Sequence, residues 1–220
     1  MRSLYVLVSV GALSAVCTTL SAQQEGFAVL RRADTVAIER FERGTPKWSG
    51  TLEIRKQPRS QYEVWSVIRG PESGVVLMEV TEKEAPESEK HKPRIIQEAR
   101  LIFKDDSVAI DAVTNGGLMT RLYATRKGAM PYLNLSFATI ELVLDEARKL
   151  QPNASGPVPV AMFALAGGHT ADATVSFSGD GATVQVGKVA IECALLPDGR
   201  IRTATIAAQE LRAERLPCGA

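Results

Sequence analysis

The sequence predicts a mainly β protein, an antiparallel meander that forms a curved sheet or half-barrel with one amphipathic helix packed on its concave side. Three observations predict it: a strand phrase that recurs, short segments of alternating polarity between turn residues, and one segment with helical spacing. Short strands joined by short turns favour antiparallel neighbours. The expected organisation is a single domain over 23–220, with two β lobes, 23–116 and 117–220, as the alternative.

The recurring phrase is Val-Ala-Ile followed by an acidic residue, and its three acids are Glu39, Asp111 and Glu192. Successive side chains of a strand point to opposite faces, so Val and Ile share one face and the acid lies on the other. Each phrase is therefore expected to bury Val and Ile and to expose its acid to water. Convergence on a common strand pattern explains three such short matches better than duplication does.

Strands are predicted wherever polarity alternates or β-branched residues gather between turn signals. The expected strands are 26–32, 35–43, 48–55, 61–69, 74–82, 95–104, 107–114, 118–125, 157–165, 171–178, 182–187, 188–196, 200–206 and 210–215. The clearest turn is NGG at 115–117, which suits a tight hairpin that needs positive φ. RGPESG, SGDGA and LPDGR supply further Gly- and Pro-containing turns.

One segment, 132–150, has the spacing of a helix. Ser136 is the expected N-cap, with Asn134 competing for that role, and Pro152 ends the segment. Glu141, Asp145 and Lys149 are expected to face solvent. The apolar stripe is expected to cover the open face of the sheet, and it consists of Phe137, Ile140, Val143, Leu144, Ala147 and Leu150.

Composition excludes some partners. The chain carries a formal net charge of +1, and only 5% of its residues are aromatic. Nucleic-acid binding normally requires a basic surface and often aromatic side chains for stacking, so we expect no nucleic-acid partner. The charged segment 82–94 mixes both signs and is predicted to be a solvated loop rather than a nucleic-acid arm.

The first 22 residues resemble a cleaved signal peptide. Arg2 precedes the apolar run LYVLVSVGALSAV, and small residues lead to a cleavage site after Ala22. The rivals are an uncleaved anchor and a lipoprotein modified at Cys17, which the bulky Val16 disfavours. No later stretch is long and apolar enough for a membrane helix. We therefore expect an exported protein, periplasmic or extracellular, without a transmembrane span in the mature chain.

Two cysteines, Cys193 and Cys218, remain after the predicted cleavage. An oxidising compartment would allow a disulfide between them. The alternative is a buried free thiol at Cys193 and an exposed one at Cys218. Spacing alone cannot decide between these states, because a disulfide requires a specific geometry.

Catalytic groups are few. His169, in LAGGHTADAT, is the one plausible general base, with Asp172 three residues later. No G-x-S-x-G motif is present, and Ser176 and Ser178 fall in a predicted strand. Histidine and cysteine are too few and too scattered for a metal site, and no phosphate-binding loop is found. We therefore expect no metal and no cofactor.

The layout resembles a class of exported bacterial β-rich proteins to which no activity is attached. The shared features are the signal peptide, the meander, a P-x-x-x-x-S-F phrase from Pro131 to Phe137 that opens the helix, and a closing DGRI hairpin followed by RTATI. The likeness covers the second half of the chain well and the first half loosely. A curved sheet with a helix across it is also distantly similar, in fold, to periplasmic lipoprotein carriers. The resemblance implies no catalytic residues.

Three functions follow, in order of preference. The first is a non-catalytic exported module that binds an apolar or lipid-like ligand between sheet and helix, with Phe137, Ile140 and Leu144 as ligand contacts. The second is a scaffold or assembly partner in the cell envelope that uses sheet edges or the segment 82–94. The third is a hydrolase that uses His169. The possible partners are thus an apolar ligand or an envelope protein.

Overall fold

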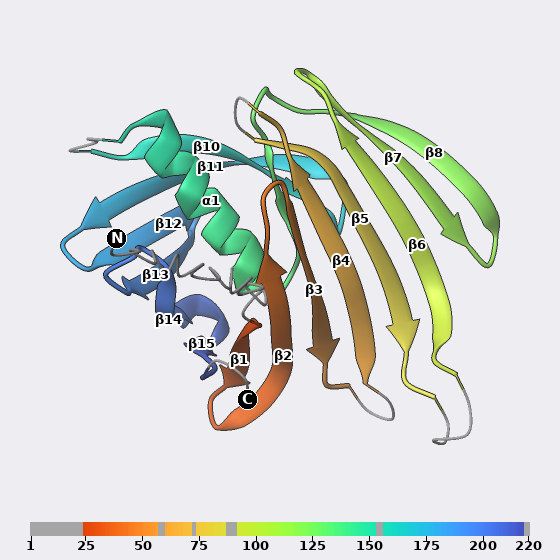
Figure 1. The fold of residues 1–220 in the computed structure, drawn as a ribbon, viewed down its shortest axis with the longest axis horizontal. Coiled ribbons are helices and arrows are strands. Elements are labelled where there is room, and N and C mark those ends of the chain that lie inside the picture. The colour runs from red at the N-terminus through yellow and green to blue at the C-terminus, as the bar shows by residue number, and fades with distance from the viewer. Residues whose placement is uncertain (1–23, 57–59, 72–73, 87–91, 153–155, 218–220) are drawn as a thin grey trace, which may run out of the picture.

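A computed structural model describes residues 24–56, 60–71, 74–86, 92–152 and 156–217. These residues form one sheet of fifteen strands and one α-helix, in an architecture that is curved but not closed into a barrel (Figure 1). The strands are β1 Glu25–Arg31, β2 Asp34–Arg43, β3 Lys47–Ile54, β4 Gln61–Arg69, β5 Val75–Glu84, β6 Arg94–Phe103, β7 Ser107–Thr114, β8 Gly117–Ala124, β9 Met130–Tyr132, β10 Val158–Ala164, β11 His169–Ser178, β12 Gly181–Val186, β13 Val189–Leu195, β14 Ile201–Ile206 and β15 Leu211–Arg215.

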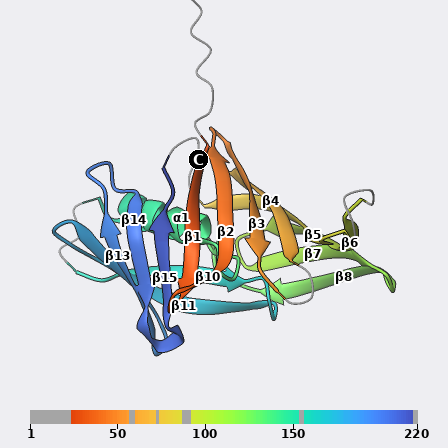
Figure 2. The ribbon, with the colours of Figure 1, turned by 90° about the horizontal axis from the view of Figure 1, so that it is seen from below.

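Strands β1 to β8 form one antiparallel meander and β10 to β15 form another. The two are joined because β15, the last strand, pairs antiparallel with β1, the first. β8 lies at one end of the sheet and β9 at the other, where it pairs parallel with β10. The view from below shows the sheet bending around the helix (Figure 2). The predicted fold class is thus confirmed.

All fourteen predicted strands are present, and most of their ends differ from the prediction by one or two residues; one strand was missed, and one loop is shorter than predicted. Strand β9, Met130–Tyr132, was missed because it has only three residues, with Pro131 in the middle, and so shows no readable alternation of polarity. The segment 82–94 is shorter than expected, because β5 continues to Glu84 and pairs there with Arg94 of β6. Residues 87–91 lie outside the described part of the chain.

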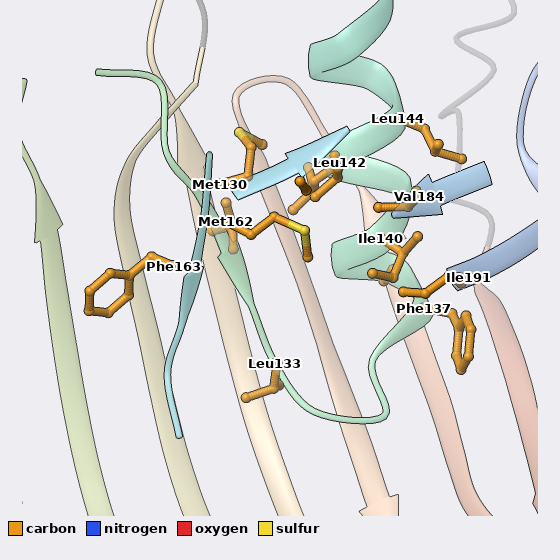
Figure 3. Packing of buried hydrophobic residues seen from close by; sticks show 14 of the residues in the cluster. Met130, Leu133, Phe137, Ile140, Leu142, Leu144, Met162, Phe163, Val184 and Ile191 are labelled. Carbon is orange, nitrogen blue, oxygen red and sulfur yellow. The ribbon is translucent and has the colours of Figure 1, made fainter. Parts of the chain in front are cut away.

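Strand β10 is covered on both faces. Met162 points toward the helix, while Phe163 points the other way (Figure 3). The Phe163 ring lies 6.0 Å from the ring of Phe103 in β6 and 6.0 Å from that of Tyr123 in β8, measured between centroids. The sheet therefore curls until one end packs against the other. Burial on both faces explains why β10 reads VPVAMFA, a nearly continuous apolar run.

Helix α1, Phe137–Leu150, lies in the hollow of the sheet. It begins five residues later than the predicted segment, with Ser136 as its N-cap, as expected. The side chain of Ser136 accepts a hydrogen bond from the amide of Thr139. The helix is buried on several sides rather than along one stripe. The expectation that Glu141 faces solvent is wrong, because Glu141 is 2% exposed, whereas Lys149 is exposed as expected.

The face assignment of β2 was also wrong. Asp111 and Glu192 lie on the outer face of the sheet as expected, but Glu39 is fully buried and Val36 and Ile38 lie on the opposite face. Alternation alone identifies two faces without saying which is inside. The inner face of β2 meets the beginning of α1. There the hydroxyl of Ser136 and the first amides of the helix donate hydrogen bonds to the carboxylate of Glu39.

Candidate functional site

An apolar hollow lies between the inner face of β10–β14 and the segment that joins β9 to α1. Its volume is about 340 Å³. The sheet supplies an apolar wall, and the surrounding loops and strand ends supply most of the polar side chains. The lining residues are Met162, Ala164, Ala166, Ala171, Val186, Val189, Ile191 and Ile206, together with Tyr132, Asn134, His169 and Gln209. We call this space the apolar cavity.

Small side chains create the apolar cavity. Ala164 at the end of β10 and Ala171 in β11 face inward at positions where longer side chains would fill the space. Farther along the same strands, Val158 and Val175 pair with each other and are fully buried against the helix. Alanine at inward positions near the β10–β11 turn is thus the sequence signal for the cavity. The sequence analysis did not predict Ala164 or Ala171 as site residues.

A narrow extension of about 10 Å³ runs from the apolar cavity under the first turn of α1. Phe137 and Ile140 line it, as does Leu135, whose φ of 66° is left-handed. The amide of Ser136 donates to the carbonyl of Leu133, which closes a tight turn before the helix. This turn gives the cavity a defined wall where β9 leads into α1.

A second hollow of about 250 Å³ lies on the other side of that wall, against the inner face of β4–β6. Asn134 and Ala166 border both spaces. The second hollow is more polar and contains Glu63 and Glu82. Burial, reinforced by the Glu82 carboxylate, raises the pKa of Glu63 to about 7, and Lys56 limits the rise. The two hollows, which share Asn134 and Ala166, therefore differ in chemistry.

The carboxylate of Glu39 fixes the beginning of the helix. It accepts hydrogen bonds from Ser136 Oγ at 2.5 Å and from the amides of Phe137 and Ala138 at 2.8 and 2.9 Å. These amides are among those that a helix leaves without an internal partner. Burial raises the pKa of Glu39 to about 7, while the donated hydrogen bonds oppose the rise. Strand β2 thus positions the wall of the apolar cavity.

A buried ring of alternating charges fixes the middle of the helix. Glu141 forms ion pairs with Arg43 of β2 and Arg215 of β15, and it accepts a hydrogen bond from the amide of Ile201 at 2.6 Å. Glu25 of β1 completes the ring by pairing with the same two arginines. Its contact with Arg43 Nε is an ion pair at 2.9 Å that lacks hydrogen-bond geometry.

The two arginines of the ring also favour the charged form of Glu141. Burial raises the pKa of Glu141, while Arg43 and Arg215 pull it down. The guanidinium groups stack on aromatic rings as well, with Arg43 over Trp48 at 4.6 Å and Arg215 over Phe27 at 4.7 Å. The pairs connect α1 to the β1–β2–β15 region, where the two meanders join. The helix is therefore anchored at the seam of the sheet.

The predicted ligand contacts Phe137, Ile140 and Leu144 are nearly fully buried in the packed core between helix and sheet (Figure 3). Phe137 and Ile140 touch only the narrow extension, and Leu144 lines none of the hollows described above. The larger space, the apolar cavity, is lined mainly by side chains of the sheet and by none of the three predicted contacts.

His169 borders the apolar cavity, but the expected catalytic neighbours lie elsewhere. Asp172, three residues later in β11, points to the opposite face and pairs with Arg126. Ser176 and Ser178 share the face of Asp172, because strand side chains alternate. The described structure therefore brings neither acid nor serine of this strand to His169.

Cys193 is a buried thiol without a disulfide partner among the described residues. Burial, with a smaller contribution from Glu141, raises its pKa to about 12. Cys218 lies outside the described residues. The bridge between them stays a prediction.

Within the described ranges, no three histidine, cysteine or acidic side chains gather closely enough to hold a metal ion. The described part of the chain also contains no helix with the length and apolar character needed to cross a membrane. Comparison of the chain with protein-family models, with curated proteins and with solved structures found no match.

Proposed function

We propose that the protein is a non-catalytic binding module for an apolar or lipid-like ligand, and that the ligand occupies the apolar cavity. The single observation that carries the proposal is an apolar hollow of about 340 Å³ bounded by sheet and loop, with a few polar groups along its border. Small-molecule sites are commonly of this kind: a mostly apolar space of roughly 300–1,000 Å³ with a small number of orienting polar groups.

The lining indicates the chemistry of the ligand. No carboxylate, lysine or arginine is among the described residues that line the apolar cavity. Burial of an unpaired charge is costly, so a charged group would not be held there. Tyr132, Asn134 and Gln209 can each donate and accept hydrogen bonds, and the imidazole of His169 adds two ring nitrogens at the border of the cavity. The ligand that fits has an apolar body with one uncharged polar end.

Filling the cavity tests the proposal. Ala171→Phe would place a ring in the apolar cavity, whereas Ala190→Phe places the same ring on the outer face of β13. We expect native mass spectrometry of protein purified from its own envelope to show a bound apolar molecule. Wild type and Ala190→Phe should retain this molecule, and Ala171→Phe should lose it while remaining folded. No bound molecule in the wild type, or equal retention in all three proteins, would reject the proposal.

We also propose that the protein acts outside the cytoplasm, as its first 22 residues suggest. The resemblance to exported β-rich proteins and periplasmic lipoprotein carriers gives the same expectation. N-terminal sequencing of protein recovered from the host should begin at or near Gln23. An intact Met1 in the exported fraction would contradict export by cleavage.

An envelope scaffold is the second candidate, and one observation favours it. Among the described strands, β8 ends the sheet with no strand paired to its outer side, although Ala124 at its end accepts a hydrogen bond from Thr170 of β11. A free strand edge is a ready template for pairing with another chain. If the scaffold function is correct, the protein from the envelope should carry no apolar molecule and its assembly should depend on β8.

A further inference from the structure

The outer edge of the sheet combines free backbone groups with exposed apolar side chains. Every residue of β8 from Gly117 to Leu122 is exposed. Leu118 and Leu122 are 72% and 69% exposed, and Val113 beside them in β7 is 49% exposed. Figure 1 shows β8 as the outermost strand, beyond β7. Natural sheets usually protect such an edge with charge, proline or a covering segment.

The register identifies which backbone groups are free. Thr114 and Gly117 flank a two-residue turn, and such a flanking pair exchanges both hydrogen bonds. The amide of Thr125, in the same alternation, donates to the carbonyl of Asp106. Odd-numbered residues of β8 thus bond to β7, and even-numbered residues direct their N–H and C=O groups to the open edge. Ala124, an even-numbered residue, follows the same alternation: its carbonyl points away from β7 and accepts a hydrogen bond from the hydroxyl of Thr170 in β11.

The sequence of this edge is symmetric about Thr120. Leucine lies two residues before it, at Leu118, and two residues after it, at Leu122. These three residues direct their backbone groups to the open edge, and their side chains share the outer face. An antiparallel copy centred on Thr120 would place each Leu118 opposite the Leu122 of the other copy, and Met119 opposite Arg121. No like charges would face each other.

We propose that two copies of this chain pair through β8, antiparallel and centred on Thr120. The pairing joins the two curved sheets and covers the exposed leucines. A two-fold contact uses the same edge of both copies and closes the assembly. The other edge of the sheet is β9, which has only three residues and packs against β5. The pairing therefore ends at a dimer. This inference does not depend on the apolar cavity.

Charge placement tests both the dimer and its register. In the proposed register, Leu118→Lys/Leu122→Lys sets like charges opposite each other twice, whereas Leu118→Lys/Leu122→Glu sets opposite charges together twice. We expect sedimentation of the full chain, produced with its own leader, to show a concentration-dependent dimer. The double-lysine variant should raise the dissociation constant by about tenfold or more. The Lys/Glu variant should dimerise more tightly than the double-lysine variant.

The matched control is Val64→Lys/Val76→Lys, which adds the same two charges at exposed positions of the central strands β4 and β5. It should dimerise as the wild type does, and circular dichroism should show the same strand content in all four proteins. A wild type that stays monomeric at every concentration would overturn the proposal. A dimer equally weakened by the control, or two β8 variants that behave alike, would also overturn it.

Discussion

The carboxylate of Glu39, in the middle of β2, lies 2.8 Å from the amide of Phe137, the first residue of α1. These residues are 98 positions apart, so the contact exists only because the sheet curves around the helix. It holds the first turn of α1, and with it the segment from Leu133 to Ser136 that walls the apolar cavity. The shape of the candidate site thus depends on an acid that is far from the cavity in sequence.

Stability should depend on pH through Glu39. Its pKa is about 7 in the folded protein and about 4.5 when unfolded, so the folded state binds the extra proton between these values. The contribution of Glu39 to the free energy of unfolding should therefore be highest below pH 4.5 and fall as pH rises to about 7. A shift of this size accounts for on the order of 3 kcal/mol. Urea unfolding at a series of pH values measures it.

Glu39→Gln should flatten this pH dependence, because the amide keeps its acceptor oxygen and does not titrate. Glu63, whose pKa is also raised to about 7, should leave part of the slope. Glu192→Gln, an exposed acid on the outer face, is the control and should follow the wild type. A Glu39→Gln profile as steep as the wild-type profile would show that Glu39 does not titrate in this range.

Removal of Glu141 should destabilise the protein strongly. Glu141→Ala leaves Arg43 and Arg215 without one of their two carboxylate partners in a buried site. Loss of one partner from a buried ion pair typically costs about 3–5 kcal/mol. Lys149→Ala, on the exposed side of the same helix, should change stability by less than about 0.5 kcal/mol. Denaturant unfolding compares them, and equal effects would mean that the ring contributes nothing.

Ile140→Ala distinguishes a core position from a ligand contact. Ile140 is 1% exposed and meets only the narrow extension of the cavity. We expect a loss of about 2–5 kcal/mol, as for other large-to-small core substitutions. The loss should be the same before and after delipidation. A much smaller loss in the delipidated protein would instead place the ligand against the helix.

The two cysteines give a separate test. Cys193 should resist alkylation in the native protein, because its thiol is buried and its pKa is raised to about 12. Unfolding without reductant should then decide the predicted bridge. In the chain that begins at Gln23, a monomer without alkylated thiol would establish the disulfide with Cys218, and two alkylated cysteines would exclude it.

The sequence by itself determined the strands and the helix cap. Period-two alternation and turn residues located fourteen strands, and Ser136 was predicted as the N-cap with Asn134 as its competitor, because these signals depend on neighbours along the chain. The three-residue β9 carried no such signal. Its partner β10 follows the helix in the chain, so β9 forms only when folding brings Met130–Tyr132 beside β10.

The tertiary structure decided which faces are inside, and with them the candidate site. Alternation separated Glu39 from Val36 and Ile38 without revealing that Glu39 meets the helix. Helical spacing likewise placed Glu141 away from the apolar stripe, yet arginines from β2 and β15 compensate its charge in the core. The cavity depends on space left where Ala164 and Ala171 meet a distant loop. Local patterns report the polarity of a residue and its immediate neighbours, whereas burial, charge pairing and empty space depend on residues that only the folded chain brings together.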